Sequence, residues 1–337
     1  MFGRRNTQTK AQHLRQGRMA RTSSRTASVA KLDVGAVVDT ERYPIHDLEG
    51  KRGQELIRRC KDALKKVGSV SLQGFIRNDV ISKMASEVSP LISCAYQRID
   101  IIPPYRPEDG YFVSNFPNVR NSHPLLKRIA QDMYALAADQ IPKASLIQRV
   151  YDLLEVQEFI GRVYGKERLY PFADEFQAMN IMYMKDGCSQ TYHYDESDGI
   201  VTLVLQEPEQ GGEFEFAPYV RSKDSESFDS IKKLFDGKYP TRLIKPKAGT
   251  LNLFNGKYSM HRVRTVFGPK TRIIAVMSYD TQPGTHSNPA KNVALYGERV
   301  REIYESRGTS CSVAKKSFSK AEEMEERKRR RQLGSKL

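Results

Sequence analysis

The part of the chain after about residue 175 is a series of short runs rich in β-branched and aromatic residues, and this pattern constrains the fold most. Gly, Pro, Asp and Lys separate the runs, which are QAMNIMYM, IVTLVLQE, GEFEFAPY, TRLIKP, GTLNLF, HRVRTVF and TRIIAVMSYD. Several short strands at this spacing, with little helix between them, are typical of a sandwich or barrel. We therefore expect residues 171–285 to form a double-stranded β-helix, or jelly roll.

The first half of the chain carries helical patterning instead. In QELIRRCKDALKKV, apolar side chains recur at the spacing of one helix face. Similar patterns predict helices over 78–99, 123–140 and 143–165, with a short strand VSLQGF before the first of them. Pro and Gly in residues 103–122 predict a loop, a candidate lid over a pocket. The expected fold class is α+β, with a mainly helical part (33–170) packed on the jelly roll.

The net charge of +15 would suit a nucleic-acid-binding protein if the basic residues were spread over the folded body. They are concentrated at the two ends. Residues 1–32 hold eight Lys and Arg and no acid, and residues 315–337 hold nine Lys and Arg against four Glu. The remainder is nearly neutral, so specific nucleic-acid binding by the body is not expected.

The expected folded domain spans residues 33–310, between these two ends. Residues 1–32 have the Arg-, Ser- and Thr-rich, acid-free composition of an organelle transit peptide, and the same composition suits a disordered basic tail. Residues 311–337 include SKAEEMEERKRRRQ, which predicts a charged helix or tail whose Glu residues precede its Arg residues.

Membrane and disulfide-stabilised classes are disfavoured. No apolar run approaches the roughly 18 residues that span a bilayer, and no signal-peptide core is found near the N-terminus. The four cysteines are widely spaced and form no CxxC pair, which argues against a disulfide framework or zinc ribbon. We expect an intracellular protein, cytoplasmic or, if the first tail is a transit peptide, organellar.

The stretch TYHYDESDGIVTLVLQ, residues 191–206, places a histidine and three acids immediately before a strand. Side chains of an extended chain alternate between faces, so His193 and Asp195 share one face and can reach one metal ion. A His-x-acid pair by itself arises easily by chance in a chain with forty acids. The interpretation therefore depends on what accompanies it.

Two later residues complete a set. His261 lies between two β-rich runs and is one of only six histidines. Two histidines and one carboxylate form the facial triad that binds Fe(II) and leaves positions open for other ligands. Arg272 begins the run RIIAVMSY, where an unpaired charge is costly, and arginine meets a carboxylate through two parallel hydrogen bonds. Together these residues predict a site for iron and 2-oxoglutarate.

The order of HxD, then GTLNLF with HRV, then the arginine resembles the Fe(II)/2-oxoglutarate-dependent oxygenases, which fold as a double-stranded β-helix. The resemblance runs from NIMYMKDG to SYDTQPG. It is similar to a branch that contains hydroxylases of small metabolites and free amino acids, and radical halogenases. The resemblance implies Fe(II), 2-oxoglutarate and dioxygen as cofactor and cosubstrates, and ascorbate could serve as a reductant.

Site residues follow from the resemblance one by one. His193, Asp195 and His261 match the iron ligands, and Arg272 matches the arginine that binds the distal carboxylate of 2-oxoglutarate. Polar cosubstrate contacts are expected from Asn180 and Tyr183. Many relatives carry Ser or Thr two residues after the arginine, where this chain has Ile274, so that contact is in doubt. Glu196 is a candidate partner for a substrate ammonium group, and a solvated turn residue is the alternative.

The radical halogenases replace the metal carboxylate with a small residue, which leaves room for chloride. This chain keeps Asp195. We therefore expect oxidation of a C–H bond of a small, amino-acid-derived metabolite, with succinate and CO2 as coproducts. A hydroxylase, an oxidative cyclase or a desaturase of secondary metabolism would use the same triad.

Two interpretations of other kinds are carried alongside. A non-catalytic β-sandwich binding module with basic tails would show salt-sensitive binding and no effect of His193→Ala. An oxygenase of protein or nucleic acid is the other, but the neutral body and the lack of a recognisable peptide groove argue against it.

Overall fold

The structure, a computed structural model, describes residues 32–102, 129–195, 199–222, 225 and 227–311. The helices within these ranges are α1 (Val34–Val37), α2 (Lys51–Val67), α3 (Asn78–Val88), α5 (Leu146–Tyr151), α6 (Leu154–Val163), α7 (Phe228–Phe235), α8 (Pro289–Tyr296) and α9 (Glu298–Ser306), with 3-10 helices η1 (Ser89–Cys94) and η3 (Ala138–Gln140). The strands are β1 (Ser69–Leu72), β2 (Tyr96–Ile102), β3 (Ile129–Leu136), β4 (Tyr170–Pro171), β5 (Met179–Met184), β6 (Gln190–His193), β7 (Gly199–Gln206), β8 (Gln210–Gly211), β9 (Phe214–Ala217), β10 (Arg242–Ile244), β11 (Leu251–Phe254), β12 (Met260–Val263), β13 (Val266–Phe267) and β14 (Arg272–Asp280).

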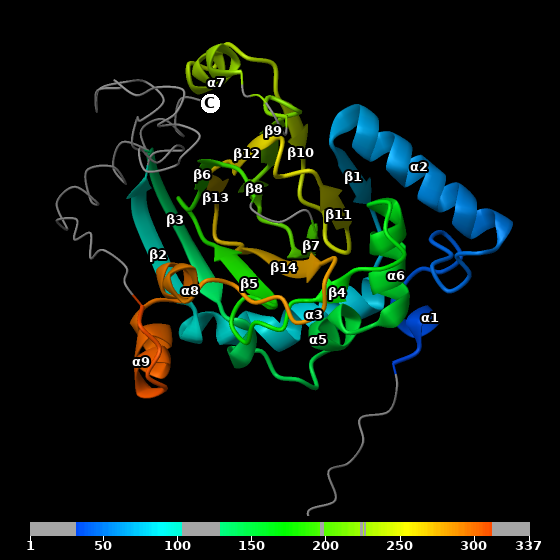
Figure 1. Ribbon diagram of the computed structural model, residues 1–337, viewed down its shortest axis with the longest axis horizontal. Helices are drawn as coiled ribbons and strands as arrows, with labels where there is room; N and C mark the ends of the chain where they lie inside the picture. Colours follow the sequence, from blue (N-terminus) through cyan, green and yellow to red (C-terminus); the bar gives the residue numbers. More distant parts are fainter. Residues whose placement is uncertain (1–31, 103–128, 196–198, 223–224, 226, 312–337) are drawn as a thin grey trace, which may run out of the picture. The chain divides into compact units, whose positions relative to one another are not determined.

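Antiparallel pairing joins the described strands into a large and a small sheet (Figure 1). The large sheet has eight strands in the order β1-β11-β7-β14-β5-β3-β2, with β4 added beside β14. The small sheet has four strands in the order β10-β9-β12-β6, and β13 pairs with β8 separately. This is the jelly-roll arrangement that the β-rich runs predict. Strands β4 to β14 come from residues 170–280, and β1, β2 and β3 of the large sheet come from the earlier part of the chain.

The two sheets face each other across an interior filled by side chains from both. Met133 on β3 and Met184 on β5 form one buried cluster with Val263 on β12 and Val266 on β13. On the small sheet, the Phe214 ring packs against Phe254 of β11, with ring centroids 4.8 Å apart. The space between the sheets is therefore a packed interior, and polar groups pointing into it lie among apolar neighbours.

The opposite face of the large sheet is covered by helices, with α3 and α5 running along it (Figure 1). Residues that alternate with the interior ones, such as Ile181 on β5 and Ala275 and Met277 on β14, join the main hydrophobic cluster with side chains of α3, α5 and α6. This period-two alternation assigns each strand residue to one of two environments. A mainly helical N-terminal part packed on a jelly roll is confirmed.

Two predicted helices differ from the structure. The helix expected over 78–99 ends at Val88, and a 3-10 turn containing Pro90 leads into β2, because proline lacks the N–H that continues a helix. The segment expected as a helix over 123–140 contains β3 instead. Gln131, Met133 and Ala135 are buried and alternate with more exposed residues, and β3 pairs with β2 and β5 on its two sides. Tertiary pairing therefore overrides the helical pattern.

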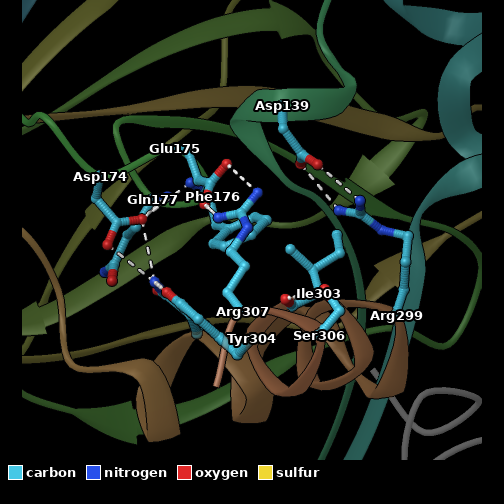
Figure 2. A network of polar contacts seen from close by, with 11 residues as sticks. Asp139, Asp174, Glu175, Phe176, Gln177, Arg299, Ile303, Tyr304, Ser306 and Arg307 are labelled. Carbon is cyan, nitrogen blue, oxygen red and sulfur yellow. Dashed lines mark hydrogen bonds and ion pairs between the residues drawn. The ribbon is translucent and has the colours of Figure 1, made fainter. Parts of the chain in front are cut away.

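The C-terminal helices α8 and α9 are fastened to the jelly roll by polar contacts, which Figure 2 shows. The buried Asp174 carboxylate accepts hydrogen bonds from the Asn292 amide and from the backbone N–H of Ser287. Arg299 forms a two-bond ion pair with Asp139, and Arg307 pairs with Glu175. The helix α8 also contacts β2 and β3 of the large sheet.

Several predicted features fall outside the described residues. These are the two terminal tails, the loop at 103–122 and residues 196–198. None of the helices in the described ranges is both long enough and apolar enough to cross a membrane.

Candidate metal centre

The three predicted metal ligands converge on one point of the small sheet. His193 at the end of β6 is the register partner of His261 on β12, and their rings lie 4.1 Å apart, centroid to centroid. An Asp195 carboxylate oxygen, Oδ1, lies 3.5 Å from His261 Nε2 and 3.9 Å from His193 Nε2. Two atoms that each lie about 2.1 Å from one ion are at most about 4.2 Å apart. Both Asp195 distances lie within that limit, and the ligand atoms of the three residues are grouped closely enough that they could hold one metal ion.

Both imidazoles are oriented by the backbone two residues before them. His193 Nδ1 lies 2.9 Å from the Thr191 carbonyl oxygen, and His261 Nδ1 lies 2.9 Å from the Ser259 carbonyl oxygen. A carbonyl accepts only, so each Nδ1 carries the proton and donates it. Each Nε2 then keeps its lone pair toward Asp195. Such outer contacts fix the tautomer and direction of metal-binding histidines.

The protonation states also favour a metal. Burial lowers the pKa of His193 to about 4, and the neighbouring His261 adds to this effect against the opposing influence of Asp195. Burial alone would raise the pKa of Asp195, but His261, His193 and Lys291 outweigh it, so the pKa is lowered overall. A neutral imidazole and an ionised carboxylate are the forms that bind a divalent cation.

Arg272 is a buried guanidinium for which the described residues supply no matching anion. It begins β14 opposite Met184 of β5 and is only 4% exposed. Within the described part of the chain, its Nε has no hydrogen-bond partner, and its Nη1 contacts the Met184 sulfur at 3.8 Å. Burial lowers the pKa of Arg272 to about 10, with no described acid acting on it. An arginine in this state fits a ligand carboxylate, which would supply the missing charge and acceptors.

Apolar side chains surround the interior that holds Arg272. Met184 belongs to the cluster with Met133, Cys188 and Val263, and Val263 lies two residues beyond His261 on the same strand. Gly212 lies against the guanidinium stem, since a Cβ there would come within 2.9 Å of Arg272 Cδ. The apolar cluster therefore extends from the neighbourhood of Arg272 to the strand that carries His261.

The other predicted contacts are placed differently. Tyr183 lies in the main hydrophobic cluster on the helix face of the large sheet, and its hydroxyl donates to the Val88 carbonyl oxygen at 2.7 Å. It therefore faces away from Arg272, because adjacent strand residues point to opposite faces. Asn180 is on the interior face and lies beside the Tyr296 hydroxyl of α8. Glu196 lies outside the described residues.

Three neighbours of the triad were not singled out in the sequence. Lys291 of α8 acts electrostatically on Asp195, and Arg98 of β2 acts on His193. Both belong to elements whose proximity to the site only the fold reveals. Thr191 is 4% exposed and its hydroxyl oxygen has no partner among the described residues. The alternation of residues 191, 193 and 195 was the available signal for Thr191.

The comparisons with known proteins agree in kind with this site. A family model described as Halogenase D matches residues 125–295, just over half of the chain. That range includes His193, Asp195, His261 and Arg272. No curated protein sequence matches the chain.

The chain is also similar to several solved structures. One is an oxidoreductase of the 2OG-Fe(II) oxygenase family from Burkholderia pseudomallei, with 16% identity, 68% of this chain and 92% of that chain covered, and a TM-score of 0.44. Another is the non-heme alpha ketoglutarate dependent epimerase SnoN from nogalamycin biosynthesis, with 14% identity, coverages of 70% and 91%, and a TM-score of 0.45. A third is a Pseudomonas putida prolyl-4-hydroxylase, with 14% identity, coverages of 66% and 98%, and a TM-score of 0.38.

Proposed function

Because the chain belongs to the Halogenase D family, we propose that it is a non-haem Fe(II)/2-oxoglutarate-dependent oxygenase that oxidises a C–H bond of a small metabolite. The observation that carries the proposal is the pairing of a His-Asp-His cluster with a buried, anion-free arginine in one apolar interior. A binding module would have no use for both. Each group is costly to bury without its ligand.

The residues divide the work between metal and cosubstrate. His193, Asp195 and His261 would hold Fe(II), and Arg272 would hold the distal carboxylate of 2-oxoglutarate. When bound, the iron would activate dioxygen for the oxidation of 2-oxoglutarate to succinate and CO2. The backbone carbonyls of Thr191 and Ser259 keep both histidines in the ligating tautomer. The cluster around Met184 keeps bulk water from the interior.

The presence of Asp195 helps to decide between halogenation and oxidation without halogen incorporation. Its carboxylate lies beside both histidines and supplies the third protein ligand. A chloride ion at that position would have to replace it. We therefore propose an outcome without halogen incorporation, although the family model takes its description from a halogenase.

Amino-acid-derived metabolites are the proposed substrate class. The support is the sequence resemblance to the branch that acts on such compounds, together with two cationic side chains near the triad. Lys291 and Arg98 lie close enough to influence the ligands electrostatically. Hydroxylation is the proposed outcome, and cyclisation or desaturation by the same site is the alternative.

The first experiment is an anaerobic absorption titration of the purified protein with Fe(II) and then 2-oxoglutarate. The expected result is a visible charge-transfer band that forms with wild type, is absent with His193→Ala, and needs much more 2-oxoglutarate with Arg272→Met. Lys270→Met is the matched control, because Lys270 is a nearby exposed base. Absence of the band in folded wild-type protein would refute the proposal.

Product mass then separates the outcomes. With amino-acid-like substrates, hydroxylation adds about 16 Da, desaturation or cyclisation removes about 2 Da, and chlorination adds about 34 Da, since each replaces or removes hydrogen at carbon. A chlorinated product formed with Asp195 in place would overturn the assignment drawn from that residue.

A further inference from the structure

Gly256 lies directly against the carboxylate of the metal-ligand candidate Asp195. It is buried in the turn between β11 and β12. A Cβ built on Gly256 would lie 1.7 Å from Asp195 Oδ2, 2.5 Å from its Cγ and 2.9 Å from its Cβ. These are the three nearest atoms, and all belong to Asp195. Real Cβ atoms do not approach other atoms below 3.0 Å, so a side chain at position 256 and this placement of the carboxylate exclude each other.

The requirement for glycine at 256 is one of space and not of backbone conformation. Many glycines here have a positive φ that disfavours any side chain, for example Gly249 and Gly268, but Gly256 is not among them. Alanine could therefore adopt the backbone of residue 256. The three nearest atoms that an alanine side chain there would meet all belong to Asp195.

Hydrogen bonds hold the turn that carries Gly256 and oppose its movement away from Asp195. The Gly256 carbonyl accepts the Asp195 backbone N–H at 3.2 Å. The Asn255 N–H donates to the Gly68 carbonyl at 3.0 Å, and the Arg221 guanidinium donates to the Lys257 carbonyl. The Ser259 carbonyl at the end of the turn orients His261. One turn thus fixes two of the three ligands.

We propose that Gly256 is a positioning residue for the metal centre, which admits the Asp195 carboxylate as the third ligand by having no side chain. The inference rests on the metal site of the proposed function and adds a determinant outside the ligand set. A side chain at 256 would turn the carboxylate out of the site and leave two histidines. In a variant without the Asp195 side chain, the same substitution would have nothing to displace.

A double-mutant cycle with Co(II) tests this proposal without any turnover. The proteins are wild type, Gly256→Ala, Asp195→Gly and the double variant, titrated by visible absorption. Gly256→Ala is expected to weaken Co(II) binding by at least the roughly 10- to 100-fold that follows loss of an outer contact of a metal ligand, because here the ligand itself is displaced. Its Co(II) spectrum should match that of Asp195→Gly, and the double variant should bind like Asp195→Gly. Gly35→Ala is the control, since a Cβ there meets only ordinary contacts.

Each outcome decides something. Wild-type affinity and spectrum in Gly256→Ala would overturn the inference, and so would a further loss of affinity in the double variant. If Gly256→Ala folds poorly, the same cycle is read in the unfolding midpoint of the metal-free proteins, where Asp195→Gly must restore stability. If wild type binds no Co(II), the proposed metal site fails, and the metal-free cycle still tests the contact between residues 195 and 256.

Discussion

Glu215 and Arg272 are both buried ionised side chains of the jelly roll, yet their surroundings are opposite. Glu215 on β9 accepts hydrogen bonds from Arg262 and Arg264 at 2.9 and 2.8 Å and from the Thr241 hydroxyl at 2.9 Å. Arg272 on β14 has a weak sulfur contact, and its Nε has no partner among the residues that the structure describes. Neither is more than 4% exposed.

The difference is the one expected between a structural charge and the ligand-binding charge that we propose for Arg272. A buried charge whose partners are all supplied by the protein is part of the folded structure. Removal of one partner leaves the other as an uncompensated buried charge and destabilises the protein. A buried charge without partners destabilises the free protein. A ligand that supplies the opposite charge and the hydrogen bonds removes this penalty, and it therefore binds more tightly. On this view Glu215 belongs to the fold and Arg272 to the site.

The largest expected effect is on Arg272. Arg272→Met should weaken 2-oxoglutarate binding about 100-fold, or about 2.7 kcal/mol, because the two-bond carboxylate contact is lost. The free energy of unfolding of the cosubstrate-free protein should stay unchanged or rise, since an unpaired buried charge is removed. Absorption titration and urea unfolding measure the two quantities. A clear loss of stability would show that Arg272 is structural and break the comparison.

Glu215→Gln should do the reverse. The free energy of unfolding is expected to fall by about 1–2 kcal/mol, because charged hydrogen bonds are weakened while the partly exposed arginines limit the loss. The affinity for 2-oxoglutarate should stay within about twofold. Urea unfolding beside the exposed control Glu305→Gln gives the first value, and the absorption titration gives the second. If Glu215→Gln lowered the 2-oxoglutarate affinity as well as the free energy of unfolding, the distinction between a structural Glu215 and a ligand-binding Arg272 would fail.

The smallest effect is the pH dependence of that stability difference. Burial raises the pKa of Glu215, but the Arg264 and Arg262 contacts and the Thr241 hydroxyl outweigh it, so the pKa lies below its usual 4.5 in the folded state. A lowered folded pKa contributes stability that is complete above the unfolded value and is lost as pH falls through the folded value. Wild type and Glu215→Gln should therefore differ fully at neutral pH and converge in acid. Unfolding curves from about pH 7 to about pH 3.5 would show it, and a constant difference would contradict it.

The sequence predicted the jelly roll and the ligand set for the same reason. Strand alternation repeats every two residues, so it is visible in runs such as TRIIAVMSYD and in the spacing of His193 and Asp195. It failed at β3, where a helical pattern was overridden by pairing with β2 and β5. The expectation for Tyr183 came from the family resemblance and not from alternation, and the structure places its side chain on the helix-covered face of β5.

By itself, the sequence determined which groups can bind a metal and a carboxylate, because that chemistry depends on residue type and on local spacing. Only the tertiary structure decided what surrounds them. Gly256 against Asp195, the opposing placements of Glu215 and Arg272, and the approach of Lys291 on α8 all join residues distant in the chain. Such contacts arise from packing between elements, and no local period in a sequence encodes them.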